Sequence, residues 1–319
     1  MVKSSKPLPQ HLPDYLDWLD VQKGLSSKTQ ENYARFLNRF LDWLKENKLS
    51  DLKPHDLSPD HVWKYRIYLA RQTRSKRSSK SLSKSTQAYY LIALRSLLTY
   101  FAERDILALP PEKIKLPRDK GEKEVRFLTL EQLERLFSIP NVNKASGLRD
   151  RAILETFFST GMRISELVAL NREQIQSSLN LNELELGIVG KGSRARTVYF
   201  SSRTLQWLKR YLKSRTDNDK ALFINYRSMS SASRRLTARS IEKSIQKYAL
   251  LAGLPANTTP HVLRHSFATD LLSQGVDIRI LQEFLGHQSI TATQIYTHVT
   301  SKKLREIHKK FHSGSRLKN

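Results

Sequence analysis

A charged, proline-punctuated segment divides this sequence into two parts that must fold separately. The segment, residues 110–125, opens with two consecutive prolines and carries no apolar period. Proline cannot continue a helix, and a charged segment without an apolar face has no surface to bury in a core. The 319 residues suffice for two domains of ordinary size. We therefore expect a domain at residues 1–109, a linker at 110–125 and a second domain at 126–319.

The first part has the pattern of a small all-helical domain. Apolar residues recur at three- and four-residue steps over residues 33–44, and Ser27 followed by Gln30 has the form of a capping box ahead of them. Ser58-Pro59 is typical of a second helix start. The rest is expected to be a loop at 71–84, rich in serine, lysine and arginine, and a helix at 85–104.

The second part is expected to be mostly helical, with one β-hairpin. Residues 183–189 and 195–200 have the composition and alternation of strands, and the glycine-rich turn between them carries Lys191. Helices are predicted from Thr129, over 239–252 and from Thr259-Pro260. The predicted fold class is mainly α with a small β-sheet: an all-helical N-terminal domain followed by a mixed α/β domain.

The charge of the chain indicates a polyanionic partner. The formal net charge is +25 at pH 7, and the stretch from His61 to Ala102 contains nine Lys or Arg residues and no Asp or Glu. A merely solvated surface usually mixes signs, so we interpret this stretch as a phosphate-contacting face of a DNA-binding domain. Arg234 and Arg235 are further candidates, although a solvated loop explains them almost as well. The predicted DNA-binding residues are Lys64, Arg66, Arg74, Lys76, Arg77, Lys80, Lys84 and Arg239.

Several classes of protein are disfavoured by composition. The sequence has no cysteine, which excludes disulfides, thiol nucleophiles and cysteine metal sites. It has no apolar stretch long enough to span a bilayer, and its first residues lack the apolar core of a signal peptide. We therefore expect a cytoplasmic, nucleoid-associated protein without a membrane partner.

Four short segments of the second part contain residues that could carry chemistry. Taken singly, each residue has an ordinary explanation: an arginine paired with a nearby glutamate, a solvated turn lysine, a surface pair on a helix, a capping histidine and a structural tyrosine. The segments are residues 160–167 with Arg163, the hairpin turn with Lys191, His261-Val262-Leu263-Arg264-His265, and Leu285-Gly286-His287 followed by Tyr296.

Taken together, these residues suit phosphoryl transfer on DNA. The reaction needs charge stabilisation and alignment, which two arginines can supply by forking onto phosphate oxygens. Histidine and lysine can move protons, and tyrosine can hold the phosphate covalently. The sequence contains no acidic cluster or His set typical of a metal site, so we expect no metal and no other cofactor.

The order and spacing of these residues resemble the tyrosine recombinase (phage integrase) family, and within it the Xer-type recombinases. The resemblance covers residues 126–311, and its most recognisable stretches are HVLRHSFATDLL, LQEFLGHQSI and TATQIYTHV. The N-terminal helices also resemble the family's core-binding domain. Asp270, where Xer proteins often have histidine, and the tail FHSGSRLKN depart from the pattern.

The resemblance implies a role for each residue. Arg163 and Arg264 would bind the phosphate, and Glu166 would support the site. Lys191 would protonate the leaving 5′-oxygen, His261 would accept the proton of the tyrosine, and His287 would be a second phosphate donor. Tyr296 would be the nucleophile that forms a 3′-phosphotyrosyl link.

The resemblance further implies a clamp on double-stranded DNA at a specific recombination site. Four protomers on two duplexes would exchange strands through a Holliday junction without ATP, and residues 302–311 would dock on a neighbouring subunit. A type IB-like topoisomerase and a non-catalytic DNA-binding protein remain alternatives, although His261 stands where the topoisomerases usually have lysine. The biological role, chromosome dimer resolution or mobile-element movement, is left open, as are the target sequence and the need for a partner recombinase.

Overall fold

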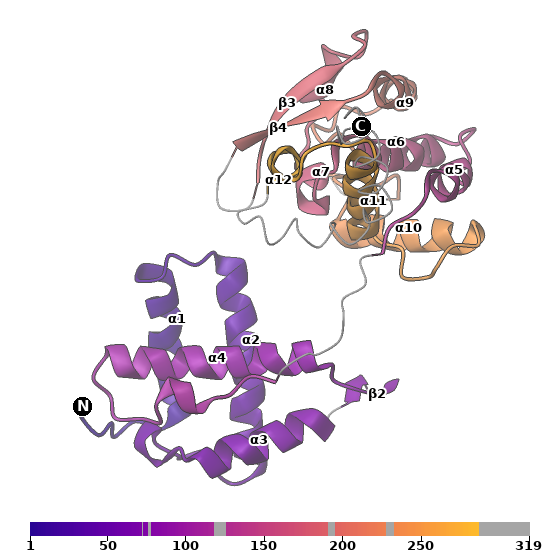
Figure 1. Ribbon diagram of the computed structural model, residues 1–319. Coiled ribbons are helices and arrows are strands. Elements are labelled where there is room, and N and C mark those ends of the chain that lie inside the picture. Colours follow the sequence, from indigo (N-terminus) through magenta and orange to yellow (C-terminus); the bar gives the residue numbers. More distant parts are fainter. Residues whose placement is uncertain (72, 76–77, 118–125, 191–194, 228–232, 287–319) are drawn as a thin grey trace, which may run out of the picture. The chain divides into compact units, whose positions relative to one another are not determined.

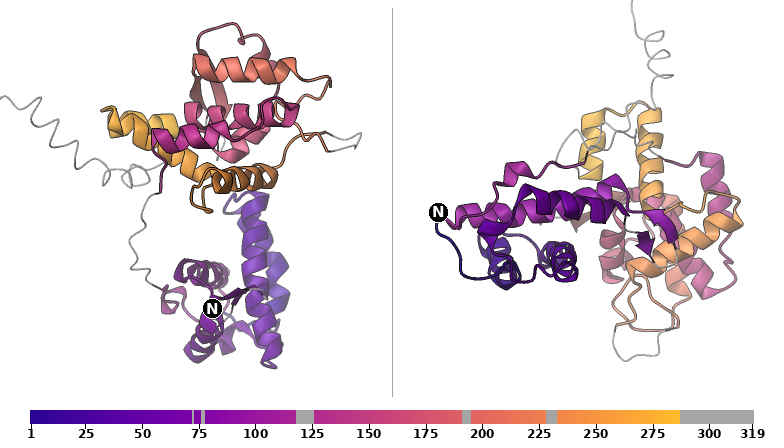
Figure 2. Two further views of the ribbon diagram at one scale, coloured as in Figure 1. Left: turned by 90° about the vertical axis from the view of Figure 1, so that its right-hand side faces the viewer. Right: turned by 90° about the horizontal axis from the view of Figure 1, so that it is seen from below.

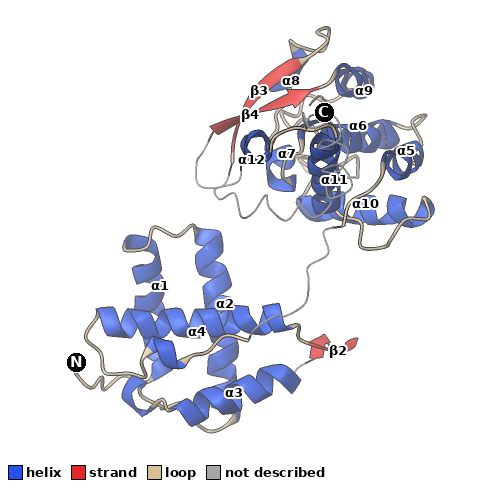
Figure 3. Cartoon of the chain, in the orientation of Figure 1, coloured by secondary structure: helices blue, strands red, loops and turns tan. Residues whose placement is uncertain are grey.

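The protein consists of two compact units, residues 1–122 and 123–319, in a computed structural model (Figure 1). The structure describes residues 1–71, 73–75, 78–117, 126–190, 195–227 and 233–286, with only the backbone for 73–75 and 78–80. Helices predominate in the described parts of both units (Figure 3), which confirms the predicted fold class.

The first unit is a helical domain in which α4 lies across α2 and also contacts α1 and α3 (Figure 1). Its core is rich in aromatic rings, with Tyr15, Phe40, Tyr65 and Phe101 almost fully buried. The apolar stripes of the helices meet there, so each helix gains its stability from its neighbours. The elements are α1 (Leu12–Val21), α2 (Ser27–Glu46), α3 (Pro59–Arg71), β1 (Thr73–Ser75), β2 (Ser78–Ser81) and α4 (Lys84–Glu103), with short 3₁₀ helices at Leu8–His11, Pro54–Asp56 and Pro111–Lys113.

Two segments of this unit differ from the sequence-based expectation. Residues 71–84 were expected to be a loop, but β1 and β2 pair there as an antiparallel hairpin. Backbone hydrogen bonds make this hairpin, and the side chains show no alternation that could have indicated it. Residues 110–117, expected to be linker, belong to the first unit, because Ile114 is 1% exposed within its core.

The second unit is built around α6, whose side chains are buried on nearly all sides. Helices α5, α9 and α11 and strand β4 pack around it (Figures 1 and 2), and α12 packs on α11 and β4. The elements are α5 (Leu130–Ser138), α6 (Ala145–Thr160), α7 (Ile164–Ala169), α8 (Glu173–Gln176), β3 (Leu184–Val189), β4 (Ala195–Phe200), α9 (Ser202–Lys213), α10 (Ala238–Leu251), α11 (Pro260–Ser273) and α12 (Ile278–Leu285).

The predicted hairpin is present as β3 and β4, paired antiparallel from Leu184 opposite Phe200 to Val189 opposite Ala195. One face of the hairpin is buried, and Arg196 lies on that face together with Val198 and Phe200, at alternate positions. The turn residues 191–194 lie outside the described residues.

In the part of the chain that the structure describes, the helices include none with the length and apolar character needed to cross a membrane.

Candidate active site

Arg163 is held at the junction between α6 and α7. Gly161 ends α6 in the left-handed conformation, with φ of 57°, and the chain turns so that Arg163 becomes the N-cap of α7. The buried Glu166 accepts the backbone N–H of Arg163 at 2.7 Å and its guanidinium at 3.1 Å. This pairing fixes the start of the side chain and leaves it 33% exposed, so that the guanidinium can reach a substrate.

Arg264 approaches the same place from α11. Its side chain is buried and donates to the carbonyl oxygen of Gly161 at 2.6 Å and to that of Leu285 at 2.5 Å. Thr259 and Pro260 begin α11 as predicted, and the helical spacing brings His261 and Arg264 to one face. The structure therefore brings together the two arginines that the sequence analysis paired.

His261 and His265 are neighbours on α11. Their rings meet edge to face with centroids 4.4 Å apart. Desolvation, with the charges of Arg264 and Arg163, lowers the pKa of His261. Deeper burial, with the charges of His261 and Arg264, lowers the pKa of His265 to about 4. Near neutral pH both rings are therefore neutral, and a neutral His261 can accept a proton.

Three further side chains of the predicted site, those of Lys191, His287 and Tyr296, lie outside the described residues. Their neighbours in the chain are described: Val189 and Ala195 on either side of the hairpin turn, and Gly286 at the end of α12. Gly286 adopts φ of 58°, which ends α12 one residue before His287.

Sequence reasoning missed Arg196, which joins this group from β4. Its guanidinium pairs with both oxygens of Glu166, at 2.7 and 2.8 Å, and its Nε donates to the carbonyl oxygen of Phe284 at 3.2 Å. The sequence did contain a sign of it. Arg196 alternates with Val198 and Phe200 on the apolar face of a strand, and an arginine at such a position needs a buried partner.

Two arginines lower the pKa of Glu166 against the opposing effect of its burial. Desolvation is the largest influence and raises the pKa, but the hydrogen bonds and charges of Arg196 and Arg163 outweigh it. The carboxylate therefore stays ionised, and the group of Arg163, Arg196, Arg264 and Glu166 carries an excess of positive charge. Such a group is suited to an anion. Among the residues that the structure describes, no cluster of His, Cys, Asp and Glu could hold a metal ion.

The predicted DNA-binding residues are distributed over both units. Lys84 and Arg239 are exposed, Arg239 with an ion pair to Glu242 at 3.3 Å. Lys64 is exposed and pairs with Asp60 at 2.7 Å, and Arg66 lies over the ring of Trp63. The side chains of Arg74, Lys76, Arg77 and Lys80 lie outside the described residues.

Arg235, one of the further DNA-contact candidates, uses its guanidinium for contacts within the protein. Its guanidinium donates to the carbonyl oxygens of Val168 and Leu170 and to the side chain of Asn171, at the end of α7. A single arginine can satisfy several orphan carbonyls at a helix end, and this one fastens the segment before α10 to α7.

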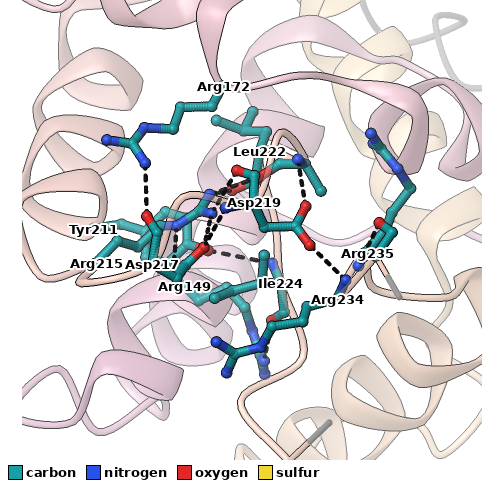
Figure 4. Close-up of polar contacts among 12 residues, drawn as sticks. Arg149, Arg172, Tyr211, Arg215, Asp217, Asp219, Leu222, Ile224, Arg234 and Arg235 are labelled. Carbon is teal, nitrogen blue, oxygen red and sulfur yellow. Dashed lines mark hydrogen bonds and ion pairs between the residues drawn. The ribbon is translucent and has the colours of Figure 1, made fainter. Parts of the chain in front are cut away.

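A buried arginine, Arg215, orders the same segment. Arg215, whose side chain is fully buried, pairs with Asp217 and donates to the carbonyl oxygens of Asp219, Ala221 and Leu222 (Figure 4). Asp219 in turn accepts the backbone N–H of Arg234 at 2.5 Å. Between α9 and α10, this network fixes the path of residues 215–222 and ties Arg234 to them, with little regular secondary structure in these residues.

Comparison with known proteins agrees with this geometry. Residues 126–303 match the phage integrase family, and residues 12–105 match the phage integrase N-terminal SAM-like domain. Tyrosine recombinase XerD of Lacticaseibacillus casei is 33% identical over 309 residues, covering 94% of this chain and 98% of its own. Tyrosine recombinase XerC of Chlamydia caviae is 35% identical over 323 residues, with the same two coverages.

A solved structure shows the same fold. It is that of the XerH site-specific recombinase bound to palindromic difH substrate in a post-cleavage complex. It has a TM-score of 0.70 to this chain at 22% identity and covers 99% of this chain and 92% of its own. With two matched domains and relatives aligned over almost their full length, this chain belongs to the phage integrase family of tyrosine recombinases.

Proposed function

We propose that this protein is a site-specific DNA recombinase that cuts and rejoins one strand at a time through a 3′-phosphotyrosyl link at Tyr296. The observation that carries the proposal is the meeting of Arg163 and Arg264, from different helices, at one end of α12. Arg163 donates to the carbonyl oxygen of Gly286 at 3.2 Å, and Arg264 to that of the preceding residue. Two guanidinium groups held this close can bind the non-bridging oxygens of one phosphodiester.

The chemistry assigns a task to each side chain. Tyr296 attacks the phosphorus, its proton passes to His261, and Lys191 protonates the leaving 5′-oxygen. Arg163, Arg264 and His287 stabilise the charge that develops on the phosphate oxygens. The link conserves the energy of the broken bond, and the 5′-hydroxyl of a partner strand then attacks it. Neither ATP nor a metal ion has a step in this scheme.

The partner is double-stranded DNA carrying a specific recombination site. The XerC and XerD relatives and the XerH complex support this substrate class, as does the net charge of +25. Exchange between two duplexes requires four cleavages, so we propose a tetramer on two sites with a Holliday-junction intermediate. Residues 1–109 and 126–319 are proposed to contact the duplex as separate domains.

The test uses a nicked suicide duplex containing the site that the purified protein selects from genomic fragments. The wild-type protein should form an adduct that survives denaturing electrophoresis, because the nick releases the cleaved end and prevents religation. Tyr296→Phe should bind the same duplex within about twofold in affinity and form no adduct, because it lacks the nucleophilic oxygen. An adduct in the Phe variant would assign the nucleophile to another residue.

Two assays of the wild-type protein separate the alternatives. Strand exchange between two marked duplexes is expected of a recombinase. Relaxation of supercoiled DNA without exchange would instead indicate a topoisomerase, and binding without any adduct would indicate a non-catalytic DNA-binding protein.

A further inference from the structure

Three consecutive carbonyl oxygens at the end of α12 are each bound by a different arginine. Arg196 donates to the carbonyl oxygen of Phe284, Arg264 to that of Leu285, and Arg163 to that of Gly286. The last carbonyls of a helix have no partner within it and carry partial negative charge, so guanidinium groups are well suited to bind them. In the proposed function Arg163 and Arg264 also bind the phosphate, whereas Arg196 has no assigned part.

Arg196 is placed to hold other groups and not to bind the substrate. Its side chain is 9% exposed, compared with 33% for Arg163. Its donors are directed at the protein: two at Glu166 and one at the carbonyl oxygen of Phe284. Its methylene chain also lies against Gly286, where an added Cβ would come within 2.8 Å of Cδ. Arg196 thus contacts α7 and the end of α12 from the strand β4.

The pairing of Arg196 with Glu166 affects how much of the positive charge of Arg163 is neutralised by that carboxylate. Both oxygens of the carboxylate accept from Arg196; Oε1 also accepts from the guanidinium of Arg163, and Oε2 from its backbone N–H. Without Arg196, the single negative charge of Glu166 would be left to Arg163 alone. That would neutralise the guanidinium proposed to bind the phosphate and turn it toward the protein.

We propose that Arg196 is a positioning residue for DNA strand cleavage, which holds Glu166, and through it Arg163, against the fixed end of α12. The inference rests on the proposed function, because it concerns the same phosphate-binding arginines. By holding Gly286, Arg196 also sets the point from which the chain continues to His287.

The test is Arg196→Lys, measured as the single-turnover rate of adduct formation on the suicide duplex. Lysine keeps the positive charge but cannot make two parallel bonds to a carboxylate and a third to a carbonyl. Cleavage should slow by about tenfold or more, because small displacements of aligned groups have large effects on rate. Affinity for the uncleaved duplex should change by less than about threefold, since Arg196 is buried behind the site.

A double-mutant cycle with Glu166→Gln distinguishes positioning from a general loss of structure. If Arg196 acts through Glu166, Arg196→Lys should cost much less in the Glu166→Gln background than in the wild type. Arg203→Lys is the matched control. Arg203 also pairs with both oxygens of a buried glutamate, Glu155, at 3.0 Å, and among the described residues its hydrogen bonds do not reach Arg163, Arg264 or Glu166. This variant should cleave at the wild-type rate.

Cleavage rates are corrected for the fraction of active protein and are measured well below the melting temperature of each variant. Wild-type cleavage by Arg196→Lys would overturn the inference and leave the proposed function standing. So would an equal loss in both backgrounds, or a loss matched by Arg203→Lys. If the wild-type protein itself formed no adduct, the proposed function would fail, and this inference with it.

Discussion

His261 and His265 lie on the same helix, yet they differ in burial and in how far their surroundings lower the pKa of each ring. His261 is exposed at the predicted site, whereas His265 is more buried, behind it. Burial and neighbouring positive charge lower the pKa of His265 from 6.5 to about 4. Because its ring remains neutral through the physiological range, it can support the ring of His261 without adding another charge beside Arg264.

The lowered pKa of His265 predicts a pH dependence of stability. Below pH 6.5 the unfolded chain takes up a proton at this residue, whereas the folded protein does so only near pH 4. The free energy of unfolding should therefore fall as the pH drops from about 6.5 to about 4, by about 1–3 kcal/mol from this residue. His265→Gln should remove that part of the dependence in urea titrations at several pH values. If the variant showed the same pH dependence as the wild type, folding would not lower the pKa of His265.

Single residues show how far sequence could predict the site. The motif spacing placed Arg163 and Arg264 together, and their side chains do meet at the end of α12. Their catalytic roles stay predictions. Arg196 was missed because its partners, Glu166 and Phe284, are 30 and 88 residues away. No local sequence pattern reveals partners so far apart along the chain. Only the alternation along β4 indicated that the side chain of Arg196 would be buried.

The junction between α6 and α7 positions the site at the level of whole elements. Gly161 ends α6, its carbonyl accepts Arg264, and the next turn presents Arg163. A Cβ at this position would lie 2.3 Å from the ring of Phe267, one turn after Arg264 on α11. The glycine therefore allows both the left-handed turn and the close approach of α11.

Gly161→Ala should be destabilising for two separable reasons. The left-handed conformation costs a residue with a side chain about 1–2 kcal/mol, and the contact with Phe267 adds a further cost. Gly253→Ala is the control, because Gly253 has φ of +67° but nothing within 4 Å of an added Cβ. Melting temperatures should fall for both variants and further for Gly161→Ala, which should also cleave DNA more slowly. Equal losses would show that α11 moves aside freely.

Helix boundaries were predictable where capping residues mark them, and less so elsewhere. Thr129 with Gln132 forms the capping box that begins α5, and Thr259 caps α11. The box expected at Ser27 is wrong, because Ser26 is the N-cap of α2 and makes no side-chain cap hydrogen bond. Because positions 26 and 27 are both serine, spacing alone does not show which of the two is the N-cap.

At the scale of the whole molecule, the net charge of +25 suits the double-stranded DNA proposed as the partner. The acid-free stretch from His61 to Ala102 covers most of α3, the strands β1 and β2, and most of α4. The sequence predicted that this stretch is positively charged, but not which of its cations already have a partner in the protein. The structure shows that the Lys64 ammonium already has a carboxylate partner in Asp60, 2.7 Å away, just before the stretch begins. Lys84, at the start of α4, is exposed and lies next to the hairpin.

This difference predicts how each lysine contributes to the salt dependence of DNA binding. Each phosphate contact made by a cation contributes about −0.9 to the slope of log K against log salt concentration, because a counterion is released. Lys84→Gln should therefore reduce the magnitude of the slope by about 1. Lys64→Gln should reduce it less, because binding DNA would require Lys64 to give up its contact with Asp60. Lys45→Gln, an exposed change at the end of α2 outside the stretch, should leave the slope unchanged. Gel-shift titrations between low and physiological salt measure all three variants. If all three lowered the slope equally, the DNA contact would be diffuse over the first unit, and the acid-free stretch would not be its binding face.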